Sequence, residues 1–311
     1  MLNSFDAIIF KVSSKIRLID IFYPLFSITY FYQNLYGGIM CWTSEHLKWL
    51  VKTGEILKTV DGKPVDIFEF RCTDDEPTMS AWARHFRNHY CPDCDIDVMR
   101  HGTPLSRAEY LTVIKFPDRS TAPGPSIRAG DFGEVLVADY LQYCLGYWVP
   151  RTRYANKTIR NESTKGSDII GFHFFRDGKE SPQDILAIFE AKAQFVSKQD
   201  NSRLQDAIDD SAKDQIRKAE SLNAMKQRFW DLQKLDEFKK VERFQNPEDI
   251  PYIEMSGAAA LISSHIYDPA ILSTTNTQGH PNSNNLRLVV IRGDSFMDLV
   301  HELYRRAADE A

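Results

Sequence analysis

The segment from residue 184 to residue 195, DILAIFEAKAQF, most limits what this chain can fold into. Its apolar first half is typical of a strand that enters a hydrophobic core, yet the second half carries Glu190 and Lys192. Side chains alternate between the two faces of a strand, so these two charges point to the same face. Burying a carboxylate and an ammonium is costly unless they are paired or serve a function. The segment therefore predicts either a cross-strand ion pair on a solvated face or half of a metal-dependent active site.

Composition narrows the class of protein. Hydrophobic residues make up 43% and charged residues 26% of the 311 residues, which is typical of a globular protein with a substantial core. The formal net charge is -5, so a chain that binds nucleic acid needs locally concentrated positive charge or a partner that supplies it. The five cysteines are irregularly spaced and do not suggest a disulfide framework. We therefore expect a reducing, cytoplasmic location.

The first 39 residues differ from the rest of the chain. They are aromatic and apolar, but Asp20 and Pro24 interrupt them, and the unbroken part is too short to span a bilayer. A membrane-surface anchor, a partner-binding segment and an untranslated upstream extension all remain open. Ordinary globular sequence begins at Met40, which favours the last. We expect residues 1–39 to be peripheral and expect no stable membrane association.

A cluster of proline, glycine and serine at residues 117–126 is the best internal boundary. We therefore expect an accessory, partner-binding region at residues 40–125 and a second domain at residues 126–311. The first region is predicted to be α+β. Its expected elements are a helix at 44–58, a strand at 65–73 and a helix at 78–90.

The second region alternates helices and strands. Helices are expected at 130–145, 203–245 and 294–307, and strands at 147–155, 167–175, 184–195, 258–264 and 286–292. This order predicts an α/β fold in which helices flank a mixed sheet.

The predicted sheet brings acidic residues together. A polar turn at 176–183 favours a hairpin that sets Asp168 beside Glu190 and Lys192, and Glu134 in the preceding helix can lean over the same edge. Crowded carboxylates without a cation would repel one another and partly protonate. Mg²⁺ takes oxygen ligands and activates water for phosphodiester hydrolysis, while a lysine can hold or deprotonate that water. The set therefore makes more sense with a divalent cation, Mg²⁺ (or Mn²⁺), than without one.

A basic segment leads directly to Asp168. It contains Arg151, Arg153, Lys157, Arg160 and Lys165. The segment is either a solvated loop or a track for the phosphate backbone of DNA, and its position beside the acidic residues favours the track.

A second candidate metal site lies upstream, where His85, His89, Cys91 and Cys94 offer zinc ligands. Four ligands this close in sequence would struggle to reach one tetrahedron, so the sequence leaves zinc open.

The acidic set resembles the PD-(D/E)xK nuclease superfamily in the GSD of 166–168, the EAK of 190–192 and the helix that carries Glu134. Gly166-Ser167 stands where that superfamily usually has a proline before the aspartate. The resemblance implies that Asp168, Glu190 and the carbonyl of Ala191 bind Mg²⁺ and that Lys192 serves the attacking water. Glu134 would support the metal, and Gln194 resembles the extra catalytic glutamine of some branches.

Longer sequence segments show a closer resemblance to a known family. ARHFRNHY at 83–90, RAGDFGEVLVADYL at 128–141, GYWVPRTRYANK at 146–157, KGSDIIGF at 165–172 and the helical stretch at 203–226 resemble HamA, the nuclease subunit of Hachiman anti-phage defence. That resemblance implies a DNA nuclease restrained by a helicase-like partner, HamB, until DNA is sensed. A catalytically silent DNA-binding or assembly module, or a stand-alone restriction-type endonuclease, remains the alternative.

Overall fold

The computed structural model describes residues 42–176, 178–196 and 202–311. Met40–Ala311 makes one compact unit. The expectations for residues 1–39 concern residues outside the described part of the chain. Within the described ranges, no helix combines the length and the apolar character needed to cross a membrane.

A mixed seven-stranded sheet forms the centre, in the order β1-β3-β7-β6-β5-β4, with β2 paired to β3. Strands β3, β7, β6 and β5 run parallel, while β1, β2 and β4 pair antiparallel with their neighbours. The strands are β1 (Leu50–Lys52), β2 (Leu57–Lys58), β3 (Pro64–Phe70), β4 (Ile169–His173), β5 (Ile185–Gln194), β6 (Ile253–Ser263) and β7 (Leu286–Gly293).

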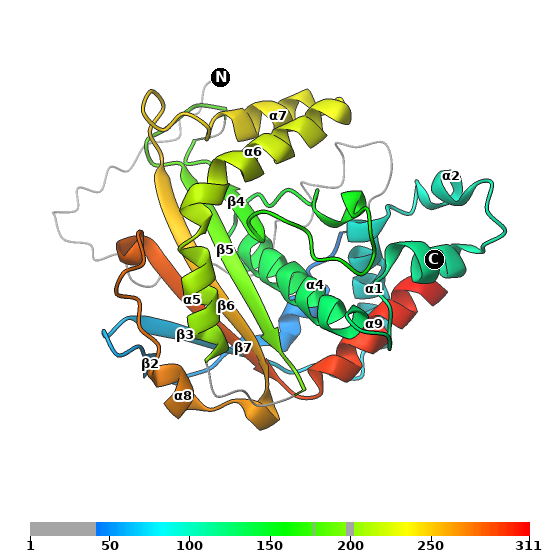
Figure 1. The fold of residues 1–311 in the computed structure, drawn as a ribbon, viewed down its shortest axis with the longest axis horizontal. Helices are drawn as coiled ribbons and strands as arrows, with labels where there is room; N and C mark the ends of the chain where they lie inside the picture. The colour runs from blue at the N-terminus through cyan, green and yellow to red at the C-terminus, as the bar shows by residue number, and fades with distance from the viewer. Residues whose placement is uncertain (1–41, 177, 197–201) are drawn as a thin grey trace, which may run out of the picture. The chain divides into compact units, whose positions relative to one another are not determined.

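Helices cover both faces of the sheet (Figure 1). The α-helices of the described residues are α1 (Glu76–Tyr90), α2 (Ile96–Arg100), α3 (Arg107–Tyr110), α4 (Gly124–Asp139), α5 (Arg203–Ser211), α6 (Asp214–Asp231), α7 (Leu235–Glu242), α8 (Pro269–Ser273) and α9 (Phe296–Asp309). In β6, Ala259 and Leu261 pack towards α1, α4 and α9, whereas Ala258 and Ala260 pack towards α5. Residues 257–262 of β6 are therefore apolar on both faces, as expected of a strand buried on both sides.

The α/β class and the mixed sheet between helices agree with the sequence prediction, and so do the strands predicted at 65–73, 167–175, 184–195, 258–264 and 286–292. The sheet runs across the boundary predicted at residues 117–126, because β3 pairs with β7. Residues 40–125 thus supply strands to the same sheet as residues 126–311.

The helix predicted at 44–58 is wrong beyond its first turn. A short 3-10 helix covers Glu45–Trp49, and β1 follows at once. The reason is tertiary, since Leu50–Lys52 pairs antiparallel with the end of β3 and gains backbone hydrogen bonds that the local apolar spacing cannot supply.

Two other predictions need correction. The segment predicted as a strand at 147–155 makes a single bridge, from Trp148 to Phe172, and then leaves the sheet at Pro150, which has no N–H for a ladder. The helical stretch predicted at 203–245 is three helices, α5 to α7. The break between α6 and α7 coincides with Gln233, whose φ of 57° is incompatible with a continuing helix.

Candidate active site at the open edge of strand β5

Strand β4 covers only part of β5. The first pair in their antiparallel ladder is Ile169 with Phe189, and β5 continues to Gln194 beyond it. Extending this register by one residue sets Asp168 opposite Glu190, and cross-strand neighbours point to the same face. An Asp168 carboxylate oxygen accepts the backbone N–H of Ala191 at 3.2 Å. Because the N–H and C=O of one strand residue point the same way, the Ala191 carbonyl also faces this open edge.

Glu190 and Lys192 lie on the face of the sheet that α6 covers, in line with Ile188. The Lys192 ammonium lies 2.7 Å from Glu190 Oε1 and 2.6 Å from Asp210 Oδ2. Although burial lowers the pKa of Lys192, the hydrogen bonds to Asp210 and Glu190 outweigh it and raise the pKa, so the lysine stays charged. Gln194, at the end of β5, is partly buried on this same face.

Glu190 carries the clearest sign of an unmet charge. The residue is 4% exposed, and its Oε2 atom is buried with no hydrogen-bond partner among the described residues. Burial and then the nearby charge of Asp168 raise the pKa of Glu190 to about 8. This is the behaviour expected of carboxylates crowded without enough positive charge.

Glu134 reaches the site only through Arg153. The Arg153 guanidinium lies 3.0 Å from Glu134 Oε2 and 2.8 Å from Asp168 Oδ1, and it also donates to the Ser167 carbonyl. Glu134 Oε2 accepts the hydroxyl of Tyr154 as well. Burial and the charge of Asp168 raise the pKa of Glu134 well above its ordinary value. The structure thus brings Glu134 close to Asp168, but with a guanidinium between them.

Two acidic residues of the site were not predicted from the sequence. Asp210 lies near the end of α5 and pairs with Lys192, and Asp214 begins α6 and accepts the Ser167 hydroxyl at 2.9 Å. Burial raises the pKa of Asp214 to about 6, with a further contribution from Asp168. Their spacing of four residues, which places two side chains on one face of a helix, was the available signal. The predicted single helix across 203–245 missed the break between α5 and α6.

The basic segment is largely engaged with acidic partners. Arg151 lies 2.7 Å from Asp139, Lys157 lies 2.6 Å from Asp131, Arg160 lies 3.1 Å from Asp118, and Arg153 holds Glu134 and Asp168. Lys165 is exposed. These four side chains already have acidic partners, and their role in DNA binding stays a prediction.

A cavity of about 490 Å³ lies beside this segment. Glu134, Arg153, Lys165 and Asp168 are in its wall, together with residues of α6 such as Ser221. The cavity therefore reaches the acidic site from the side of Asp168.

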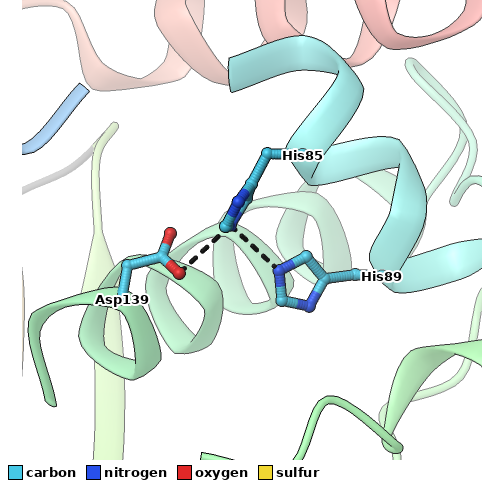
Figure 2. Close-up of side chains that lie close together, drawn as sticks. All are labelled: His85, His89 and Asp139. Atoms are coloured by element: carbon cyan, nitrogen blue, oxygen red, sulfur yellow. Dashed lines mark hydrogen bonds and ion pairs between the residues drawn. The ribbon is translucent and has the colours of Figure 1, made fainter. Parts of the chain in front are cut away.

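A separate polar cluster is buried between α1 and α4. His85 Nε2 lies 3.1 Å from Asp139 Oδ1 and 3.3 Å from His89 Nε2 (Figure 2). His46 Nε2 lies 3.0 Å from the second Asp139 oxygen, and Arg151 also contacts Asp139. These partners hold the pKa of Asp139 well below its ordinary value although burial opposes them. Asp139 is thus a buried carboxylate with three donors.

The hydrogen bond from Thr43 decides how this cluster is interpreted. The Thr43 backbone N–H donates to His85 Nδ1 at 3.1 Å, which places the ring hydrogen on Nε2, facing Asp139. A histidine nitrogen that binds a metal carries no hydrogen, and its other nitrogen normally donates. Hydrogen bonding therefore accounts for the cluster without a metal.

The zinc site considered for His85, His89, Cys91 and Cys94 does not assemble. Across the described ranges, the one group of three potential metal ligands within 4.8 Å of one another is His85, His89 and Asp139, which contains no cysteine. Cys91 is buried after the end of α1, whereas Cys94 is exposed. Among the described residues, neither Glu134 nor Asp214 forms such a close group with Asp168 and Glu190.

Comparison with known proteins gives one family. No curated protein matches the chain. The model of the HamA family matches residues 45–307, a range that contains Glu134, Asp168, Glu190 and Lys192. Because this match spans well over half of the chain, the protein belongs to the HamA family.

Proposed function

We propose that the protein is a DNA nuclease of the PD-(D/E)xK type that depends on Mg²⁺ (or Mn²⁺) and acts in anti-phage defence. Membership in the HamA family points to the defence role. The observation that carries the nuclease proposal is the alignment of Asp168 with Glu190 across β4 and β5, with Lys192 on the same face. Cytoplasmic action is part of the proposal.

The donor set fits a hard divalent cation. Asp168, Glu190 and the Ala191 carbonyl offer oxygen atoms at one sheet edge, and the buried Glu190 Oε2 has no partner within the described part of the chain. Mg²⁺ is held in proteins by one or two carboxylates together with water and substrate oxygens. When bound, the cation would lower the pKa of an attacking water and stabilise charge on the phosphate.

Lys192 is assigned a role as a cation. Because its hydrogen bonds to Glu190 and Asp210 raise its pKa, it remains an ammonium near neutral pH and does not accept a proton from water. We propose that it orients the attacking water and offsets negative charge on the phosphate. Arg153 and Tyr154 would fix Glu134, which supports Asp168 from the α4 side.

DNA capture is proposed to depend on a helicase-like partner of the HamB type. The chain is net negative, and Arg151, Arg153, Lys157 and Arg160 all have acidic partners. Each phosphate contact adds salt-sensitive affinity, so few available cations mean weak binding to DNA alone. Co-expression tests this part. The two chains should co-purify, and emergence of this chain alone would count against it.

Plasmid degradation tests the nuclease proposal. With the partner and Mg²⁺ present, wild type should cleave, whereas Lys192→Ala and chelation of the cation should each abolish cleavage. Lys213→Ala is a matched control, because Lys213 also pairs with Asp210 but lies outside β5. Cleavage retained by Lys192→Ala would overturn the assignment, and cleavage without any partner would favour a stand-alone endonuclease.

A catalytically silent DNA-binding or assembly module is the second candidate. The observation that favours it is the Arg153 guanidinium held between Glu134 and Asp168, where it neutralises two of the acidic groups. A silent module would bind its partner and show no cleavage by wild type under any divalent cation.

A further inference from the structure

We infer that Asp214 is the third carboxylate of the cation site, beside Asp168 and Glu190, and that Glu134 is a positioning residue. This inference rests on the proposed metal-dependent function and identifies which acids hold the cation.

The position of Asp214 supports this assignment. It is the first residue of α6, and α6 packs with Leu222 and Phe229 on the face of the sheet where Ile188 and Glu190 lie. Its Oδ1 atom accepts the hydroxyl of Ser167, the residue next to Asp168. Asp214 therefore meets the site from the helix layer, close to the point where β4 begins.

Asp214 and Glu190 are alike in their burial and in their hydrogen bonding. Asp214 is 3% exposed and Glu190 is 4% exposed. Asp214 Oδ2 and Glu190 Oε2 are both buried, and neither has a hydrogen-bond partner in the part of the chain that the structure describes. A buried carboxylate oxygen without a partner is costly, so two of them in neighbouring elements indicate a missing positive group.

The positive charge near these acids is divided among several of them. The Arg153 guanidinium serves both Asp168 and Glu134. Lys192 contacts Glu190, but it divides its ammonium between Glu190 and Asp210. Crowded carboxylates of this kind are drawn together by a divalent cation, directly or through its water ligands.

Glu134, in contrast, has partners for its carboxylate. Its Oε2 atom already receives Arg153 and Tyr154, and the Arg153 guanidinium separates it from Asp168. A cation that bound Glu134 Oε2 would have to displace the Arg153 guanidinium. Glu134 thus acts on the site through Arg153, which it helps to place against Asp168.

A purely structural role for Asp214 makes a different prediction. Through its hydrogen bond, Asp214 could serve only to hold Ser167 and hence Asp168 in place. Ser167→Ala removes that hydrogen bond and leaves the carboxylate, so it separates the two roles.

Calorimetric titration of Mn²⁺ into the full chain tests the inference. Asp214→Asn should weaken Mn²⁺ binding by more than about tenfold, and by clearly more than Glu134→Gln or Ser167→Ala, which leave every proposed ligand in place. Glu190→Gln is the positive control for a lost ligand. Unfolding of each metal-free variant shows that it folds, and Asp214→Asn should be no less stable than wild type because it removes a crowded charge.

Two outcomes would overturn the inference. Unchanged Mn²⁺ affinity in Asp214→Asn with weakened binding in Glu190→Gln excludes Asp214 as a ligand and leaves the proposed function intact. Equal losses in Asp214→Asn and Ser167→Ala would make Asp214 a positioning residue only. If wild type itself binds no Mn²⁺, the metal-dependent function fails instead, and the inference fails with it.

Discussion

The Arg153 guanidinium lies 2.8 Å from the Asp168 carboxylate and joins it to Glu134. Arg153, one cation of the basic segment, therefore pairs with two acidic residues of the candidate site. Its side chain is 16% exposed, so the pairs are largely shielded from water. The same arginine fixes the segment from residue 164 to residue 167 through its bonds to the Thr164 and Ser167 carbonyls.

Arg153→Ala should lower the free energy of unfolding by about 3–5 kcal/mol, because it leaves the buried Glu134 carboxylate and the partly buried Asp168 carboxylate without their counter-ion. Urea denaturation of the metal-free protein measures this loss. Adding Glu134→Gln to Arg153→Ala should recover part of it, since one of the two uncompensated charges disappears. If Arg153→Ala is as stable as wild type, the two ion pairs of Arg153 do not contribute to the free energy of unfolding.

The stability of the metal-free protein should fall as pH rises towards 8. Burial and Asp168 raise the pKa of Glu190 from 4.5 to about 8, so between these values the folded state keeps a proton that the unfolded state has lost. Asp214 acts in the same direction between 3.8 and about 6. Each unit of pKa shift corresponds to about 1.4 kcal/mol.

Thermal denaturation across about pH 5 to 8 in the presence of a chelator checks this dependence. Glu190→Gln cannot ionise, so its stability should change much less with pH than that of wild type. A slope as steep in Glu190→Gln as in wild type would assign the dependence to other groups.

Asp139→Asn should destabilise the fold by about 3–5 kcal/mol, because it leaves the Arg151 guanidinium and two imidazoles without the carboxylate that they share. Chelators should not change the contribution of this cluster to the free energy of unfolding, since hydrogen bonds hold the cluster together. Elemental analysis of the purified protein provides the check. Stoichiometric zinc in wild type that disappears in Asp139→Asn would contradict the hydrogen-bonded interpretation.

Gly257→Ala should cost about 1–3 kcal/mol through overpacking. A Cβ atom at this position of β6 would lie 2.3 Å from the ring of Phe189, which precedes Glu190. Gly54→Ala is the control, because a Cβ there meets nothing within 4 Å. Chemical denaturation of both variants gives the comparison, and equal stabilities would show that the Phe189 ring moves aside at little cost.

Periodicity in the sequence was sufficient for the main elements of the sheet. The apolar run that ends in Glu190 and Lys192 is β5, and the polar turn before it joins β4 and β5 in the antiparallel hairpin that was expected. Because a strand alternates strictly, the shared face of Glu190 and Lys192 follows from spacing alone. The hairpin register then made a meeting of Asp168 with Glu190 predictable.

What the sequence could not determine is which charge partners which. The distances from Arg153 to Asp168 and from Lys192 to Asp210 depend on the packing of segments far apart in the chain. A basic run has the same composition whether it faces DNA or its own acids, so only the tertiary structure showed that Arg151 and Lys157 are paired within the protein. Likewise, the turn between α5 and α6 directs Asp214 to the sheet, because helix packing against β5, rather than local propensity, sets where each helix begins.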